Sequence, residues 1–159
     1  MHIEITKKKF LLVGFEMVMD FNQGFADEMT WIRSELKRSL ERIGNKIEPI
    51  RLVGFWQPYQ AFTMTPDPAN MSKAKYFFGV EVSNLDDISS DFVVKAVPES
   101  EYAVYREESR GTAPKTEMYA VSGHEPNYEI AGDFEIFDDF SHIGENDACD
   151  MLVPIKLKV

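Results

Sequence analysis

One apolar stripe constrains the fold of this chain more than any other feature of its sequence. Between residues 25 and 43, large apolar side chains recur every three or four positions, with charged side chains between them. This spacing places them on one face and predicts an amphipathic helix. Gly44 and Asn45 follow, and both residue types tolerate the left-handed conformation in which helices commonly end. The stripe consists of Phe25, Met29, Ile32, Leu36, Leu40 and Ile43.

Segments rich in aromatic and β-branched residues lie on both sides of this helix. Residues 3–19, 50–62 and 75–83 are of this kind and predict strands. Within the first of them, Gly14 indicates either a β-bulge or a close approach of two backbones. Residues 65–70 have the composition of a turn. The first half of the chain is therefore expected to run strand, helix, strand, strand.

The second half repeats this order. Residues 92–106 predict a strand that a turn at 98–100 interrupts, and residues 112–123 predict a short helix. Two further strands are expected over 133–137 and 149–159. The repeated order favours an α+β protein that is built from a duplicated βαββ unit.

The composition excludes several classes of function. The formal net charge is −10, from 27 acidic and 17 basic residues, and such a surface repels the phosphates of nucleic acids. No apolar run approaches the roughly 20 residues that a membrane-spanning helix requires. The N-terminus lacks a cleavable leader and Cys149 is the only cysteine, which predicts a cytoplasmic protein without an internal disulfide. We therefore expect neither direct nucleic-acid binding nor membrane insertion.

The residues that usually carry metal or covalent chemistry are scattered along the chain. His2, His124 and His142 do not have the spacing of a zinc or iron site. Ser122, His124 and Asp133 occur without a nucleophile-elbow motif, and no glycine-rich phosphate loop is present. We therefore expect no metal and no cofactor.

A carboxylate inside the strand expected over 133–137 suggests a ligand site. Successive side chains of a strand point to opposite faces, so we expect Phe134 and Ile136 to face the helices, and Glu135 and Phe137 to face the other way. A buried carboxylate without a partner is costly. A ligand cation removes that cost, and each surrounding ring adds roughly 0.5–2 kcal/mol through cation–π attraction. The alternative is a solvent-facing glutamate on an edge strand.

Motifs along the chain resemble a known family. The runs Tyr102-Ala-Val-Tyr, Gly111, Phe134-Glu-Ile-Phe and Cys149-Asp-Met-Leu-Val-Pro-Ile-Lys have the order and spacing of the second half of GyrI-like effector-binding domains. Such domains are the ligand-sensing modules of multidrug-responsive AraC-type and MerR-type regulators. They also occur as free-standing proteins, and this chain resembles the integron-associated type. The first half fits through its element order and Tyr76-Phe-Phe-Gly-Val-Glu-Val, so the resemblance covers essentially the whole chain.

The resemblance implies both an architecture and a site. It implies a single domain over residues 1–159, with two βαββ (SHS2-like) halves at about 1–84 and 92–159. Antiparallel sheets would surround a central ligand groove, in which Glu135 contacts a cationic ligand.

The chain departs from the family pattern at the edge of this expected groove. Phe137 stands where the family has a tyrosine, Asp150 replaces a glutamate, and Leu152 replaces an aromatic residue that often touches ligand. The tryptophan that is usual on the second helix is missing around 118–123. These departures concern the choice of ligand more than the fold.

Aromatic residues are the candidates for the walls of the groove. Trp56 and Phe78 are favoured because strand alternation turns them away from their neighbours Phe55 and Phe77. Asp150 is either a second acid of the groove or a plain surface carboxylate. The remaining candidates, each of which is alternatively an ordinary core residue, are Tyr76, Tyr105 and Tyr119.

These observations favour a small-molecule binding protein for lipophilic cations, acting in drug or effector sensing or in sequestration. The expected fold begins within a few residues of Met1, so we expect no DNA-binding domain. One alternative is a hydrolase of reactive cyclopropane-type electrophiles, with Glu135 as general base and Tyr105 or Tyr119 as proton donor. Another is a protein-interaction module that binds a regulator or gyrase. Either a monomer or a homodimer is compatible with the sequence.

Overall fold

The computed structural model describes residues 2–58, 72–107, 123–129, 131–140 and 148–158. Within these residues the chain forms one α-helix, one short 3₁₀ helix and seven strands. In chain order they are β1 Glu4–Asp20, α1 Ala26–Ser39, η1 Leu40–Arg42, β2 Leu52–Pro58, β3 Lys73–Glu81, β4 Val93–Glu107, β5 His124–Pro126, β6 Phe134–Phe137 and β7 Cys149–Leu157.

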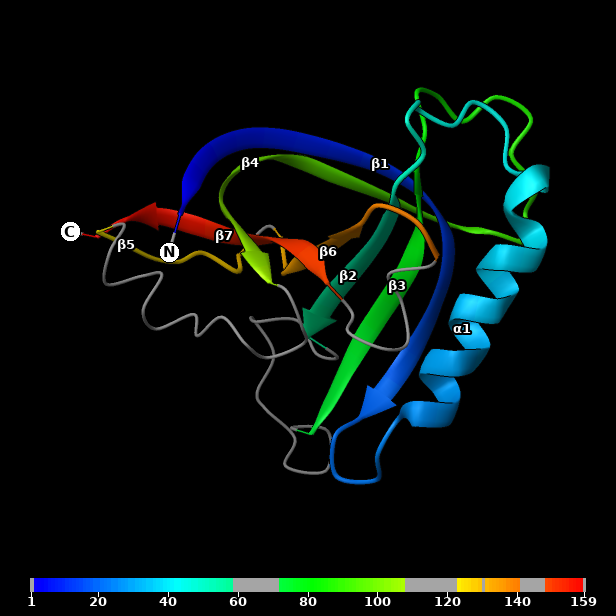
Figure 1. Cartoon of the computed structure of the whole chain (residues 1–159), viewed down its shortest axis with the longest axis horizontal. Coiled ribbons are helices and arrows are strands. Elements are labelled where there is room, and N and C mark those ends of the chain that lie inside the picture. The colour runs from blue at the N-terminus through cyan, green and yellow to red at the C-terminus, as the bar shows by residue number, and fades with distance from the viewer. Residues whose placement is uncertain (1, 59–71, 108–122, 130, 141–147, 159) are drawn as a thin grey trace.

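The strands form one antiparallel sheet whose pairings close into a ring. The order is β4-β1-β3-β2-β6-β7-β5, and β4 also pairs with β7. Six strands therefore return to their starting point, and the short β5 adds to β7 outside the ring. Figure 1 shows α1 lying along β1 and β3 on one side of this sheet. Closure leaves these six strands without open hydrogen-bonding edges along their paired lengths.

The two halves of the chain use the same pairing scheme. In the first half β3 lies between β1 and β2, and in the second half β7 lies between β4 and β6. The first strands of the two halves, β1 and β4, pair with each other, as do β2 and β6. The α+β class and the duplicated arrangement are thus confirmed. The helix expected over 112–123 lies, except for Gly123, outside the described residues.

The amphipathic helix is confirmed by α1 and η1. Met29, Ile32 and Leu36 are buried on one face of α1, with acidic residues in its first turn and basic residues in its last. Asn45 has a φ of 61°, the left-handed conformation that the sequence predicts after the helix. No helix in the described part of the chain is long and apolar enough to cross a membrane.

The expected break at 98–100 is wrong, because β4 runs through these residues without interruption. Lys8 of β1 is opposite Ser100 of β4, whereas Phe10 is opposite Val97. Two steps along β1 therefore face three steps along β4, which is the signature of a β-bulge. The bulge accommodates Pro98, since a bulged residue need not donate an N–H to the ladder. The three-residue strand β5 was not predicted either, because it is too short to show a pattern.

Gly14 marks a close approach of two backbones. It lies opposite Gly79 of β3, and a Cβ atom at position 14 would lie 2.2 Å from the carbonyl oxygen of Phe78. No larger residue fits at this point. Of the two interpretations that the sequence left open, the close approach is correct.

The sheet has two buried apolar faces. An inner cluster lies inside the ring: Phe10 of β1 stacks on Phe134 of β6 with ring centroids 4.1 Å apart, although their strands are not neighbours. An outer cluster packs on the other face, and its members include Ile32 and Leu36 of α1 together with Phe137. The inner cluster consists of Phe10, Leu12, Val53, Phe55, Phe77, Val97, Tyr102, Ala131, Phe134, Ile136 and Leu152.

This arrangement corrects one expectation about β6. Phe134 and Ile136 belong to the inner cluster and do not face α1, whereas Phe137 belongs to the outer cluster with the buried residues of α1. Strand alternation itself was predicted correctly, but the two faces were exchanged. A closed ring has an interior that must be filled, so its apolar side chains are buried without any helix.

Candidate ligand-binding site

Glu135 is a buried carboxylate in the middle of β6. It is only 5% exposed, which is unusual for a charged residue. The indole Nε1 of Trp56 on β2 donates a hydrogen bond of 2.9 Å to its Oε1. Glu135 therefore lies on the outer face, beside the expected groove residue Trp56, and is not a solvent-facing residue of an edge strand.

Aromatic rings continue from this hydrogen bond along the outer face. The ring centroids of Trp56 and Tyr76 are 4.4 Å apart, and those of Tyr76 and Phe78 are 6.2 Å apart in a stacked arrangement. Phe78 in turn meets Phe137 edge to face at 6.3 Å. We call these four rings and Glu135 the Glu135 cluster. Strands β2, β3 and β6 are neighbours in the sheet, so alternation on three separate strands brings these side chains together.

Gly54 makes room for the polar atoms of the Glu135 cluster. It lies on β2 opposite both Glu135 and Phe78. A Cβ atom at this position would lie 2.4 Å from the hydroxyl oxygen of Tyr76 and 3.2 Å from Oε1 of Glu135. The hydroxyl and the carboxylate therefore occupy the space that a side chain at position 54 would fill.

Two aromatic residues at the cluster were not predicted as groove walls. The rings of Phe21 and Phe25 lie 5.7 Å and 6.0 Å from that of Trp56, and they contact each other edge to face at 5.2 Å. Phe21 is 55% exposed. The sequence assigned Phe25 to the helix stripe, but it precedes α1 with non-helical dihedrals. The available signal was the Asn22-Gln23-Gly24 turn, which separates Phe21 from the helix.

Other predicted site residues have different positions. Tyr105 of β4 is buried in the outer cluster and pairs with Met151, which pairs on its other side with Glu135. Tyr119 lies outside the described residues. The described part of the chain contains no group of three or more histidine, cysteine, aspartate or glutamate side chains that could hold a metal ion.

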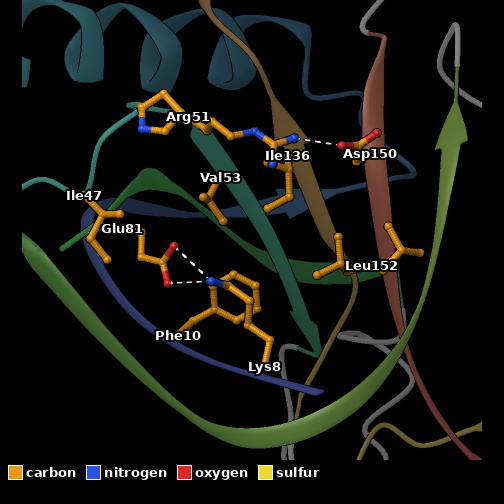
Figure 2. A pocket seen from close by; sticks show the side chains of 11 residues that line it. Lys8, Phe10, Ile47, Arg51, Val53, Glu81, Ile136, Asp150 and Leu152 are labelled. Atoms are coloured by element: carbon orange, nitrogen blue, oxygen red, sulfur yellow. Dashed lines mark hydrogen bonds and ion pairs between the residues drawn. The ribbon is translucent and has the colours of Figure 1, made fainter. Parts of the chain in front are cut away.

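The structure does not bring Asp150 and Leu152 to the Glu135 cluster. They pair with Ile136 and Phe134, so they share the inner face of β6 and β7. Both line a separate cavity, which Figure 2 shows from close by. Asp150 accepts hydrogen bonds from Arg51 at 2.7 Å and from Arg106 at 3.3 Å. It is therefore a partner of two guanidinium groups and not a second acid beside Glu135.

Solved structures share the fold of this chain. The structure of SAV2435 bound to tetraphenylphosphonium matches with a TM-score of 0.60 at 16% sequence identity, covering 98% of this chain and 94% of that chain. An integron cassette protein of Vibrio cholerae matches with a TM-score of 0.55 at 11% identity, covering 97% and 95%. EcmrR in complex with DNA matches with a TM-score of 0.64 at 6% identity, covering 99% of this chain and 58% of that chain. The fold is that of GyrI-like effector-binding domains.

A family model identifies the chain more closely. The model of Cass2, the integron-associated effector binding protein, matches residues 4–155. The protein therefore belongs to the Cass2 family of integron-associated effector-binding proteins. The family resemblance drawn from the sequence motifs is thereby confirmed. No curated protein matches this chain in sequence.

Proposed function

We propose that this protein binds a lipophilic cation against Glu135, in effector sensing or in sequestration. The observation that carries the proposal is the buried carboxylate of Glu135, which is held by Trp56 within a row of aromatic rings. The membership in an effector-binding family supports ligand binding as the function, and the charge and the rings support a lipophilic cation as the ligand.

Electrostatics favours a cation at this site over a neutral or anionic molecule. A carboxylate removed from water loses much of its hydration, so a positive charge beside it is favoured over a neutral or negative one. A positive group at contact distance restores favourable interactions for the carboxylate. Aromatic faces such as those of Trp56 and Tyr76 attract the same positive charge, by roughly 0.5–2 kcal/mol per ring. The rings also provide an apolar surface for the lipophilic part of the ligand.

A structural relative supports this choice of ligand class. SAV2435, which shares the fold, has been solved bound to tetraphenylphosphonium, a cation with four phenyl groups. A delocalised charge inside an aromatic shell is complementary to an acid that is surrounded by rings. For this chain we therefore take tetraphenylphosphonium as the probe.

The proposal is tested with a pair of probes of the same shape and opposite charge. We expect tetraphenylphosphonium to bind at least about tenfold more tightly than tetraphenylborate in isothermal titration calorimetry. Glu135→Gln keeps an oxygen for Trp56 to donate to but removes the charge, so it should weaken binding of the cation by about tenfold to a hundredfold.

A control variant separates local charge from net charge. Asp91→Asn removes one negative charge at an exposed side chain that pairs with Arg42 on the surface, and it should leave the affinity for the cation within about twofold. Equal binding of the two probes by the wild-type protein would contradict the proposal. So would an unchanged affinity in Glu135→Gln.

A further inference from the structure

A cavity lies on the face of the sheet opposite to Glu135. Its volume is about 210 Å³. The apolar residues lining it are contributed by β1, β2, β4, β6 and β7 and by the loop before β2. Ile136 faces this cavity, whereas its neighbour Glu135 faces the outer side, so β6 separates the two places (Figure 2). The apolar lining residues are Phe10, Ile47, Pro49, Val53, Val104, Ile136 and Leu152.

Two ion pairs form the polar part of the lining. Lys8 Nζ lies 2.9 Å from Oε2 of Glu81, and Arg51 Nη2 lies 2.7 Å from Oδ2 of Asp150. Figure 2 shows the two pairs on different sides of the apolar residues. Two positive and two negative groups therefore cancel within the lining. A ligand with a net charge would have to displace one member of an existing ion pair. It would therefore gain no electrostatic advantage in the cavity over its state in water.

One buried donor of Arg51 is not satisfied. Its Nε atom is inaccessible to solvent and has no hydrogen-bond partner among the described residues. Oδ1 of Asp138 lies 3.6 Å from this Nε atom, which is too far for a hydrogen bond. A buried donor without an acceptor costs about 1–3 kcal/mol. Neighbouring side chains cover the Nε atom, so an acceptor on a bound molecule removes this cost only when those side chains move aside.

We propose that this cavity is a second ligand site, for a neutral molecule with one aromatic ring and a hydrogen-bond acceptor. A cavity of about 150 Å³ lined by apolar side chains accommodates benzene, so 210 Å³ has room for one ring and a small substituent. The ring would contact Phe10, Val53 and Leu152, and the acceptor would bind the Nε hydrogen of Arg51. This site is distinct from the cation site of the proposed function in both face and charge preference.

Three probes of nearly identical shape test the charge preference. Benzamide is neutral, benzoate is an anion and benzamidine is a cation. We expect the dissociation constant of benzamide, measured by NMR titration of the labelled protein, to be at least about tenfold lower than that of either charged probe. The chemical-shift changes should concentrate at Val53, Val104 and Leu152.

Four substitutions locate the site. Val104→Phe fills the cavity from a half-buried position on β4 and should raise the dissociation constant of benzamide about tenfold or more. Arg51→Lys keeps the positive charge for Asp150 but removes the Nε donor. It should raise the dissociation constant of benzamide about fivefold. Val94→Phe adds the same bulk to β4 at an exposed position outside the cavity and should change it less than about twofold. Glu135→Gln lies on the opposite face of the sheet and should leave the dissociation constant of benzamide unchanged.

Several outcomes would overturn this assignment. They are the absence of saturable benzamide binding, equal or tighter binding of a charged probe as followed at the Val53, Val104 and Leu152 resonances, and an unchanged affinity in a folded Val104→Phe protein. If Val104→Phe fails to fold, Arg51→Lys and the positions of the shifted resonances decide instead. Because Glu135→Gln acts only on the cation site, either proposal can fail while the other stands.

Discussion

Gly54 and Tyr102 show how single positions on β2 and β4 shape the two faces of the sheet. Gly54 leaves space on the outer face for the Tyr76 hydroxyl and the Glu135 carboxylate. Tyr102 is fully buried in the inner cluster, in edge-to-face contact with Phe10 and Phe134. Burial raises the pKa of Tyr102 to about 12, and the neighbouring Ser100 hydroxyl opposes that rise.

Gly54→Ala should damage the Glu135 cluster. The added methyl group would lie 2.4 Å from the hydroxyl of the fully buried Tyr76, so that ring must move. We expect a loss of about 1–3 kcal/mol in the free energy of unfolding, measured with urea, and weaker binding of tetraphenylphosphonium. Gly44→Ala is the matched control, since nothing lies within 4 Å of its added Cβ atom. A stable Gly54→Ala protein with unchanged affinity would show that the close packing is not needed.

Tyr102 should contribute to the loss of stability at alkaline pH. Folding favours the neutral phenol, because its pKa rises from 10.0 to about 12 in the folded protein. The stability that depends on the neutral phenol is complete below pH 10 and is lost as the pH rises toward 12. Tyr102→Phe cannot ionise, so its free energy of unfolding should fall less between pH 8 and about pH 11 than that of the wild type. If urea denaturation shows the same decrease in the free energy of unfolding for the wild type and for Tyr102→Phe over this pH range, the role of Tyr102 is contradicted.

At the scale of elements, the helix and the sheet hold each other in place. The buried face of α1 packs against the outer face of β1 and β3, the same face that carries the Glu135 cluster. Phe21 and Phe25 flank the turn that leads into α1, so the start of the helix is tied to Trp56 through their rings. The position of α1 therefore affects the cluster as well as the stability of the fold.

Truncation of one buried side chain in α1 tests how much the packing of the helix on the sheet stabilises the fold. Leu36 is fully buried, and Leu36→Ala should lower the free energy of unfolding by about 2–5 kcal/mol, as the deletion of a large core side chain usually does. The measurement is urea denaturation followed by circular dichroism. Trp31→Ala is the comparison, because Trp31 is 48% exposed on the same helix and should cost less. A larger loss from Trp31→Ala would mean that α1 packs differently.

At the scale of the whole molecule, the closure of the strands into a ring explains why both faces of the sheet are buried. β4 pairs with both β1 and β7, so the sheet has an inside and an outside. The inside contains stacked rings and the neutral cavity, and the outside contains α1 and the buried acid. Two ligand sites of different charge can therefore lie on the two faces of the same strands.

The sequence determined the local features through period and composition. Apolar residues spaced three and four apart defined the helix, and alternation in Phe134-Glu-Ile-Phe correctly grouped Glu135 with Phe137. The family motifs similarly identified the family. Each of these is a property of a short segment, so no tertiary contact was needed to find it.

Only the tertiary structure decided which face of each strand is the inner one. A period of two defines two faces but does not say which of them will be enclosed, and each face of β6 carries a large aromatic residue. The closure of β4 onto β7 and the stacking of Phe10 on Phe134 made that choice. For the same reason the sequence grouped Asp150 and Leu152 with Glu135, whereas the ring places them inside, around the cavity.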